Sequence, residues 1–164
     1  MSAPAESAAK LGDGPAGIPQ PVLVRGTGLL GASIGIGLSA AGVDVRLHDP
    51  SPAALAVAAD IRAGRPARLD AAGDDLDAAP GLVVVAAPPD VTADVVVDSL
   101  RRWPAAVVVD IASVKEAVAA GVRAAVDDGR LAPQDADRYL GTHPMAGSER
   151  SGPCLLYTSP SPRD

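Results

Sequence analysis

Short apolar runs alternate with helix-length segments along most of the chain. The runs GLVVVAAPP and AAVVVDIAS are rich in β-branched residues and are bounded by Pro or Gly. Unbroken apolar strands are buried on both faces, which is typical of a parallel sheet. The alternation of strand and helix predicts an α/β fold, namely a Rossmann-type doubly wound, mainly parallel sheet. Strands are expected at 21–26, 43–49, 81–89, 105–113 and 139–144, with a short strand at 67–70 and a helical turn at 74–79.

Capping signals mark the helices between these strands. Gly42 stands where the first helix stops, and Ser51 followed by Pro52 supplies the N-cap and first position of the second. Ser113, with Glu116 three residues on, forms a capping box for the last helix. Helices are therefore expected at 29–42, 51–64, 90–103 and 113–129.

The segment GTGLLG has the spacing G-x-G-x-x-G and joins the first strand to the first helix. In a dinucleotide-binding turn, Gly26 would permit the tight bend, Gly28 would let a pyrophosphate approach the backbone, and Gly31 would let the helix lie close to the sheet. The free N–H groups of the helix N-terminus, at Leu29 and Leu30, would face the phosphates.

Asp49 ends the next strand, close to the roughly 20 residues beyond the glycines at which this fingerprint has an acid. Its carboxylate would accept hydrogen bonds from the adenosine ribose and would repel a 2′-phosphate, which favours NAD over NADP. Arg46 and Arg62 are near enough in sequence to leave NADP open. The alternative is that the glycines only form a turn and that Asp49 caps the following helix.

Two residues beside this motif are unusual. Arg25 occupies a position of a central strand that normally holds an aliphatic residue. It either reaches the pyrophosphate or packs its stem while the charged group reaches solvent. His48 is expected to point to the face opposite Asp49, and no role is assigned to it.

Composition and charge narrow the class of protein. The 164 residues are 48% hydrophobic and 21% charged, which indicates one folded domain. The net charge of −6, with scattered acids, argues against a nucleic-acid partner. No stretch approaches the roughly 20 apolar residues of a membrane span, and no metal site is expected. Cys154 is the single cysteine, which fits a reducing, cytoplasmic compartment, and residues 1–20 are expected to form a disordered leader.

The ends of the later strands carry the candidate catalytic chemistry. Ala87 and Pro88 leave a strand at the edge where such sheets bind ligands, and they either line the nicotinamide ribose or form only a rigid turn. His143 lies in a loop of small residues, where a neutral imidazole can take a proton near pH 7, although a lone histidine is more often structural. Ser113 either only caps its helix or also orients His143 and a substrate hydroxyl. Glu149 is either a polar gate to the pocket or a solvated loop acid.

Four segments in order, VRGTGLLGASIG, VAAPPDVT, DIASVK and THPMAGSERSG, resemble the nucleotide-binding half of the prephenate dehydrogenase family. The last is fairly specific, whereas the others also occur in hydroxyacid dehydrogenases and pyrroline-carboxylate reductases. The resemblance implies NAD-dependent oxidative decarboxylation of prephenate, or of arogenate, on the route to tyrosine. By their places in the motifs, His143 would accept the hydroxyl proton, Ser113 would hold the hydroxyl in register, and Glu149 would lie at the pocket mouth.

In this family a second, helical domain follows, which forms the homodimer, closes the pocket and brings an arginine to the substrate carboxylate. The resemblance therefore implies an N-terminal fragment, with a domain at 21–153, that binds NAD weakly and turns over nothing. Residues 154–164, CLLYTSPSPRD, resemble a translated sequencing adapter, the alternative being a natural Ser- and Pro-rich tail. The rival functions are an arogenate or other NAD(P)-dependent hydroxyacid dehydrogenase, and a nucleotide-binding module without catalysis.

Overall fold

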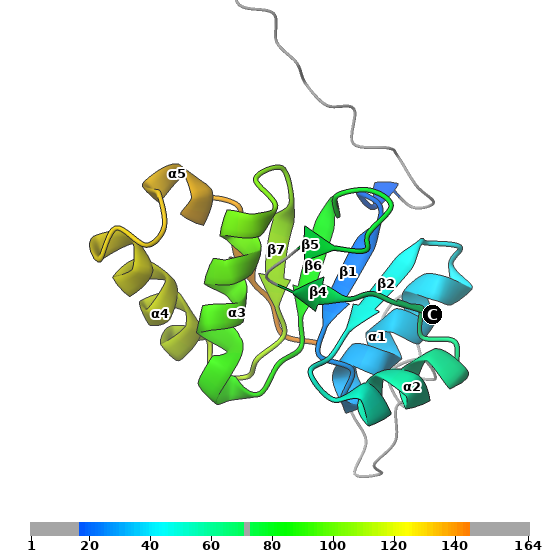
Figure 1. The fold of residues 1–164 in the computed structure, drawn as a ribbon. Coiled ribbons are helices and arrows are strands. Elements are labelled where there is room, and N and C mark those ends of the chain that lie inside the picture. The colour runs from blue at the N-terminus through cyan, green and yellow to red at the C-terminus, as the bar shows by residue number, and fades with distance from the viewer. Residues whose placement is uncertain (1–16, 71–72, 145–164) are drawn as a thin grey trace, which may run out of the picture.

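The computed structural model describes residues 17–70 and 73–144, which form a parallel sheet with helices on both faces (Figure 1). The strands of the sheet are β1 (Val22–Arg25), β2 (Val45–His48), β3 (Arg65–Pro66), β6 (Leu82–Val85), β7 (Val107–Asp110) and β8 (Tyr139–Gly141). They lie in the order β3-β2-β1-β6-β7-β8, and every neighbouring pair is parallel. The predicted Rossmann-type doubly wound sheet is confirmed.

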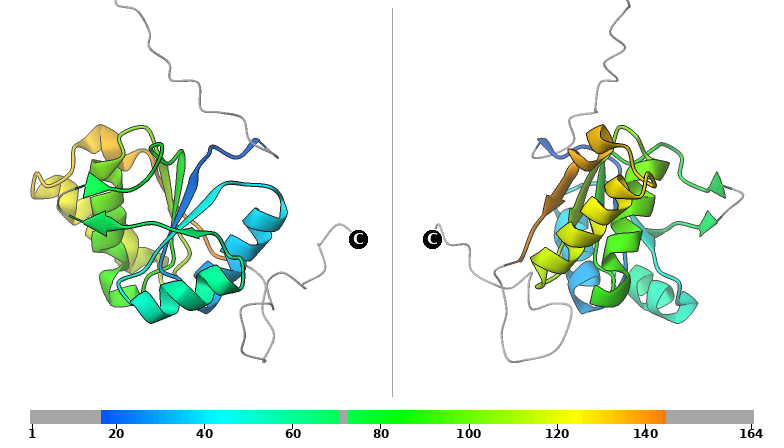
Figure 2. Two further views of the ribbon diagram at one scale, coloured as in Figure 1. Left: turned by 45° about the vertical axis from the view of Figure 1, so that its right-hand side comes forward. Right: turned by 90° about the vertical axis from the view of Figure 1, so that its left-hand side faces the viewer.

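The helices divide between the two faces of the sheet, as the views in Figure 2 show. The helices are α1 (Leu29–Ala40), α2 (Pro52–Asp60), α3 (Pro89–Arg102), α4 (Lys115–Asp127) and the short α5 (Pro133–Ala136). From β1 the chain proceeds through α1 and α2 to β2 and β3, towards one edge of the sheet. From β6 it proceeds through α3 and α4 to β7 and β8, towards the other edge. Because βαβ crossovers are right-handed, this reversal places the two pairs on opposite faces.

Alternate residues of the central strands supply two separate cores. On β6, Val83 and Val85 are fully buried on the α3–α4 face, together with Leu100 and Trp103. Val84 is buried on the other face, where the small residues of α1 and α2 pack. Burial on both faces is the physical reason for the unbroken β-branched runs in the sequence.

Two of the predicted helix boundaries are confirmed. Gly42 ends α1 with a left-handed φ of 79°. Ser51 caps α2, since its hydroxyl accepts a hydrogen bond from the Ala54 N–H at 3.3 Å. Residues 17–20, placed in the leader by the sequence, contribute contacts: Ile18 packs against the core, and the Gln20 side chain accepts a hydrogen bond from the Asp44 N–H.

The helical turn predicted at 74–79 is wrong. The Arg68 N–H donates a hydrogen bond to the Asp75 carboxylate, and the Asp75 N–H donates one to the Arg68 carbonyl oxygen. These two bonds close a hairpin instead. The Asp75 N–H is bonded to a residue seven positions earlier, so it is not available for the i−4 hydrogen bond of a helix. The hairpin strands are β4 (Leu69–Asp70) and β5 (Gly73–Asp74), so the strand predicted at 67–70 lies outside the main sheet.

The capping box predicted at Ser113 and Glu116 is also wrong. Helix α4 begins at Lys115 with Val114 as its N-cap, and no side chain caps it. The turn before the helix is organised by Asp110, whose carboxylate accepts a hydrogen bond from the Ala112 N–H at 2.8 Å.

Candidate functional site

The glycine loop lies at the point where the direction of winding reverses, between β1 and β6. Gly26 has a φ of 103°, and a Cβ on it would lie 2.5 Å from the Ala86 carbonyl oxygen. A Cβ on Gly31 would collide with the Gly26 carbonyl oxygen. The loop therefore turns tightly and α1 approaches the sheet closely, as expected of these two glycines.

Gly28 has a different environment. Apart from its own chain neighbours, no heavy atom of residues 17–70 and 73–144 lies within 4 Å of the position that its Cβ would take. It is also the N-cap of α1, which has no side-chain cap and no acidic residue in its first turn. The first-turn N–H groups of a helix lack intrahelical acceptors, so this open end can receive an anion. The side chains of Leu29 and Leu30 are 46% and 37% exposed beside it.

Asp49 holds the glycine loop from the end of β2. One carboxylate oxygen accepts hydrogen bonds from the Thr27 N–H at 2.7 Å and the Thr27 hydroxyl at 3.0 Å, and the other accepts from the Ser51 N–H at 2.8 Å. Burial disfavours the charged form, but these hydrogen bonds outweigh it and hold the pKa of Asp49 below its ordinary value. The cap of α2 is Ser51, so Asp49 is not the helix cap that the alternative interpretation proposed.

His48 is the register partner of Arg25 on β1, so its side chain lies on the α3–α4 face of the sheet. It lines the same cavity as Asp49, and its Nδ1 lies 3.4 Å from the Ala67 carbonyl oxygen. Burial lowers the pKa of His48 below its ordinary value, so the imidazole is neutral at pH 7.

The prediction that the charged group of Arg25 reaches solvent is wrong. Its Nη1 donates hydrogen bonds to Asp98 at 2.6 Å and Ser99 at 2.8 Å, and its guanidinium lies 5.9 Å from the centre of the Trp103 ring. The charged group thus binds helix α3, and the side chain is only 13% exposed. A sequence pattern cannot show a partner more than 70 positions away.

The loop after β6 forms a second wall of the site. Pro88 is the N-cap of α3. The buried Thr92 hydroxyl lies 3.0 Å from the Ala87 carbonyl oxygen and 2.8 Å from that of Pro88, which fixes the loop against the helix. Ala87 and Pro88 both line the cavity, as does Val91.

Asp110 joins the two strand ends that carry the candidate catalytic residues. Its fully buried carboxylate accepts hydrogen bonds from the Lys115 ammonium at 2.5 Å and the Tyr139 hydroxyl at 2.7 Å. Its carbonyl oxygen accepts the Thr142 N–H and hydroxyl, at 2.9 and 2.7 Å. Burial and the adjacent carboxylate raise the pKa of Tyr139 above its ordinary value. Through these bonds Asp110 ties the segment before Ser113 to the segment before His143.

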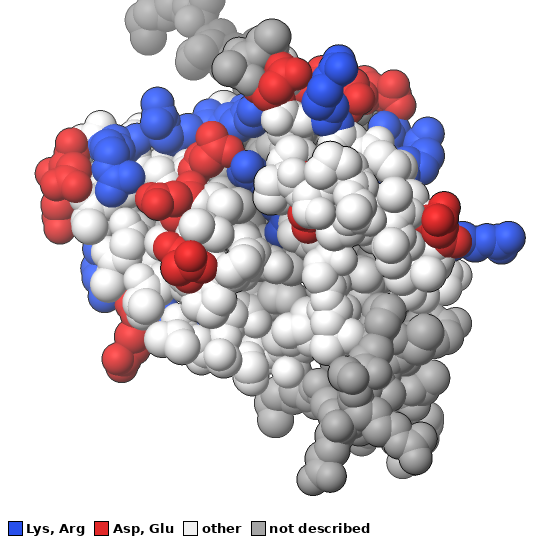
Figure 3. All heavy atoms as spheres, turned by 60° about the horizontal axis from the view of Figure 1, so that its bottom comes forward, with Lys and Arg blue, Asp and Glu red and all other residues white. Residues whose placement is uncertain are grey.

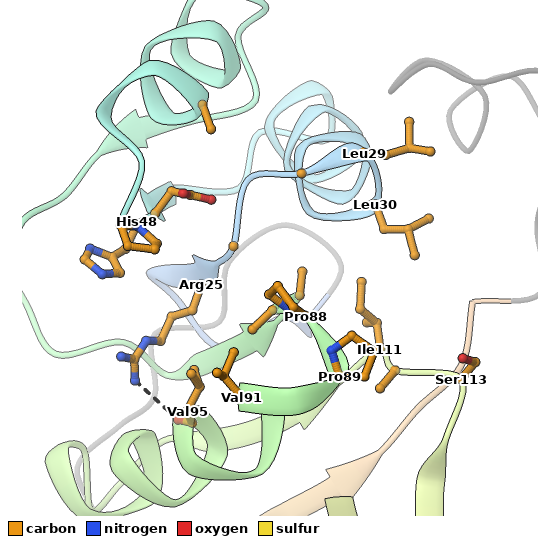
Figure 4. Close-up of a pocket in the computed structure, with 18 of the residues that line it drawn as sticks. Arg25, Leu29, Leu30, His48, Pro88, Pro89, Val91, Val95, Ile111 and Ser113 are labelled. Atoms are coloured by element: carbon orange, nitrogen blue, oxygen red, sulfur yellow. Dashed lines mark hydrogen bonds between the residues drawn. The ribbon is translucent and has the colours of Figure 1, made fainter.

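One cavity of about 750 Å³ connects these parts (Figure 4), a volume within the usual range for small-molecule sites. Figure 4 shows Arg25 and His48 at one end and Ser113 at the other. His143 also lines the cavity, whereas Glu149 lies outside the described residues. The residues predicted as binding or catalytic that line it are Gly26, Gly28, Leu29, Leu30, Asp49, Ala87, Pro88, Ser113 and His143.

The face around the strands' carboxyl ends is largely uncharged. Figure 3, which brings the bottom of Figure 1 forward, shows a mostly white surface, with acidic side chains on its left half and many of the charged side chains along its upper edge. Among residues 17–70 and 73–144 no helix is long and apolar enough to cross a membrane. Within the same residues no group of three or more His, Cys, Asp or Glu could hold a metal ion.

Sequence reasoning missed several residues of the site. Arg25 and His48 were noticed without their partners, Asp98 and the Ala67 carbonyl oxygen, and Asp110 and Lys115 were quoted in DIASVK without a role. Thr27, between the first two glycines, was not considered at all. A signal existed only for Asp110 and Lys115, since a carboxylate at a buried strand end requires a partner.

Residues 35–157 match the family described as "Prephenate dehydrogenase, nucleotide-binding domain". "Probable prephenate dehydrogenase NovF" of Streptomyces niveus is 34% identical over 131 residues, which are 80% of this chain and 32% of that protein. The chain thus spans about a third of the length of this curated relative.

Solved structures agree on the fold. A Corynebacterium glutamicum protein assigned as a prephenate dehydrogenase is 31% identical with a TM-score of 0.59, and the match covers 84% of this chain and 40% of that one. Prephenate dehydrogenase from Aquifex aeolicus is 22% identical with a TM-score of 0.59, over 80% of this chain and 45% of that one. Synechocystis arogenate dehydrogenase is 21% identical with a TM-score of 0.58, and the match covers 80% of this chain and 43% of that one. The chain belongs to the prephenate dehydrogenase family and carries the nucleotide-binding domain of that family.

Proposed function

We propose that the chain is the nucleotide-binding half of an NAD-dependent prephenate dehydrogenase, which converts prephenate to 4-hydroxyphenylpyruvate in tyrosine biosynthesis. The observation that supports this most is the single cavity that contains the glycine loop, Asp49, Ser113 and His143. The site fits a dinucleotide, because the space at Gly28 and the uncapped end of α1 can receive a pyrophosphate. When bound, NAD supplies the acceptor for a hydride from the substrate ring carbon.

The state of Asp49 supports NAD over NADP. The hydrogen bonds from Thr27 and Ser51 keep its carboxylate ionised and fixed at the cavity wall. An ionised carboxylate accepts hydrogen bonds from ribose hydroxyls and repels a 2′-phosphate. Neither Arg46 nor Arg62 lines this cavity, and Arg46 instead pairs with Asp44 and Asp77.

The residues at the other end would handle the substrate hydroxyl. His143 would accept the hydroxyl proton as hydride leaves the same carbon, and Ser113 would hold the hydroxyl in register with the imidazole. The ring then loses carbon dioxide and becomes aromatic, so the protein has only to orient the reactants and take one proton. Glu149 would lie at the pocket mouth.

Substrate and assembly are further parts of the proposal. We propose prephenate as substrate, a homodimeric parent enzyme, and no turnover by the 164-residue chain alone, which spans 32% of NovF. A competition between prephenate and arogenate, measured on a full-length parent enzyme, decides between these two substrates.

Calorimetric titration of the purified chain with NADH and NADPH tests the cofactor proposal. We expect NADH to bind and NADPH to bind about tenfold or more weakly, with the ratio reduced in Asp49→Asn. Absence of NADH binding by the folded chain would refute the proposed function. Prephenate oxidation by the chain alone, at a rate typical of enzymes, would refute the proposed lack of turnover.

A further inference from the structure

Asp110 adjoins both candidate catalytic loops without lining the cavity itself. It is the last residue of β7, and its side chain is fully buried. The three residues that follow it, 111–113, all line the cavity, and Figure 4 shows Ser113 at its end. The neighbouring strand β8 ends at Gly141, two residues before His143. Asp110 can therefore act on the site only through the two loops.

One carboxylate oxygen of Asp110 holds the chain on both sides of Ser113. Oδ1 accepts a hydrogen bond from the Ala112 N–H at 2.8 Å and another from the Lys115 ammonium at 2.5 Å. Ala112 precedes Ser113 and Lys115 follows it, so the turn that carries Ser113 is attached at two points. Hydrogen bonds to a carboxylate are shorter and stronger than those between neutral groups.

The other acceptors of Asp110 hold the segment that leads to His143. Oδ2 accepts a hydrogen bond from the Tyr139 hydroxyl at 2.7 Å, at the start of β8. The carbonyl oxygen of Asp110 accepts both the N–H and the hydroxyl of Thr142, at 2.9 and 2.7 Å. Thr142 directly precedes His143, so the position of the imidazole depends on two bonds to a single oxygen.

Packing leaves this polar group little room to move. A Cβ on Gly141 would lie 3.2 Å from Lys115 Cδ and from the Tyr139 hydroxyl oxygen, and 3.4 Å from Asp110 Oδ2. The strand therefore passes directly against the carboxylate and its two side-chain donors. A buried polar network whose members are all hydrogen-bonded is rigid and specifies one arrangement of the segments that it joins.

We propose that Asp110 is a positioning residue that fixes Ser113 and His143 relative to each other at the cavity. The inference rests on the proposed function, because it assumes that these two side chains handle the substrate hydroxyl. Proton transfer requires the imidazole within hydrogen-bond reach of that hydroxyl, and a misplacement of about 1 Å lowers the rate steeply. The two loops follow different strands, so their relative position depends on an anchor that both share.

NMR of the 164-residue chain tests this role without requiring turnover. The chain has two histidines, so a His143→Asn variant assigns the imidazole signals. The signals of the His143 ring and the Ser113 N–H are followed on saturation with NADH and with ADP-ribose, which lacks the nicotinamide. In the wild type, NADH should change both signals much more than ADP-ribose does, because the proposed hydride transfer places the nicotinamide beside these residues.

Variants separate the two attachments. Thr142→Val removes the hydroxyl bond to the Asp110 carbonyl oxygen, and Thr142→Ser restores it. Asp110→Asn alters the shared anchor directly, and Lys115→Met alters only the attachment beside Ser113. Ser39→Ala is the matched control, because the Ser39 hydroxyl also donates to a distant carbonyl oxygen, that of Ala63 at 3.1 Å, and does not line the cavity. Thermal unfolding checks that each variant is folded.

We expect Thr142→Val to reduce the NADH-induced change of the His143 signal to about half or less. Its NADH affinity should stay within about twofold of the wild type, because the glycine loop is untouched. Thr142→Ser and Ser39→Ala should respond as the wild type does. Asp110→Asn should reduce the His143 and Ser113 responses together. If that variant does not fold, Thr142→Val and Lys115→Met test the two attachments separately, with Lys115→Met reducing the Ser113 response.

A wild-type His143 response in folded Thr142→Val, or wild-type responses of both signals in folded Asp110→Asn, would refute the positioning role. In that case NADH still binds, and the proposed function stands. If NADH binds to the wild type without changing the His143 signal, the positioning role is refuted as well. If the wild type binds no NADH, the proposed function itself fails.

Discussion

The ammonium of Lys115 lies 2.5 Å from the carboxylate of Asp110, which is fully buried at the end of β7. Lys115 opens α4, so this ion pair joins the sheet to the helix beside the candidate catalytic loops. A buried carboxylate that loses its cation keeps its desolvation penalty without compensation.

Lys115→Met should therefore destabilise the chain by about 3 kcal/mol, as measured by urea unfolding. Arg130→Met is the control, because Arg130 makes only long, exposed ion pairs of 3.9 and 3.8 Å and should change stability by less than about 0.5 kcal/mol. Equal effects of the two substitutions would contradict the importance of the buried pair.

Tyr139 should make stability sensitive to alkaline pH. Burial and the hydrogen bond to Asp110 raise its pKa in the folded state above the unfolded value near 10. This contribution is fully present below about pH 10 and is lost as the pH rises towards the folded pKa. Tyr139→Phe should cost about 1 kcal/mol at pH 7. The difference between wild type and variant should shrink above about pH 10, and a constant difference up to the alkaline limit would contradict this account.

Asp49 should make the stability of the fold depend on pH in the acid range. Its pKa is lowered in the folded state, so its contribution to stability is present above the unfolded pKa near 4 and is lost as the pH falls through the folded pKa. The melting temperature of the wild type should exceed that of Asp49→Asn at pH 7, and the gap should narrow as the pH falls below about 4. A gap that stays constant in acid would show that the hydrogen bonds from Thr27 and Ser51 do not depend on charge.

Substitution of Gly28 should affect nucleotide binding, whereas substitution of Gly31 should affect the stability of the fold. A Cβ on Gly28 lies in open space as far as the described residues go, so Gly28→Ala should leave the melting temperature nearly unchanged and weaken NADH binding by about tenfold. A Cβ on Gly31 collides with the Gly26 carbonyl oxygen, so Gly31→Ala should cost about 1–3 kcal/mol of stability. Calorimetry and thermal unfolding of both variants provide the test. Loss of stability in Gly28→Ala with normal binding would show that Gly28 serves only the fold.

Arg138 should stabilise the end of α3. Its guanidinium donates hydrogen bonds to the carbonyl oxygens of Leu100, Trp103 and Ala106, at 2.7, 3.0 and 2.8 Å. Removing it takes a hydrogen bond from each of these carbonyl oxygens, although that of Trp103 still accepts the Ala106 N–H, so Arg138→Met should lower the free energy of unfolding by about 2 kcal/mol in urea. Arg138 does not line the cavity, so NADH affinity should be unchanged, and a parallel loss of affinity would reveal coupling between α3 and the site.

Several features were predictable because they depend on residues close together in the chain. The strand-forming runs, the glycine turn, the stop at Gly42 and the cap at Ser51 are all local. Where a distant or competing partner intervened, the local pattern failed. Ser113 begins no helix because Asp110 shapes the preceding turn, and residues 74–79 form no helical turn because Asp75 pairs with Arg68.

The sequence by itself determined the parallel α/β sheet and the candidate nucleotide loop, since hydrophobic periodicity and glycine spacing express burial and backbone freedom directly. Only the tertiary structure decided where the charged side chains lie. Arg25 and Asp98 are 73 positions apart, and Asp110 and Tyr139 are 29 apart. A buried polar group takes whichever partner the packing brings near, and that choice depends on the assembled fold rather than on neighbouring residues.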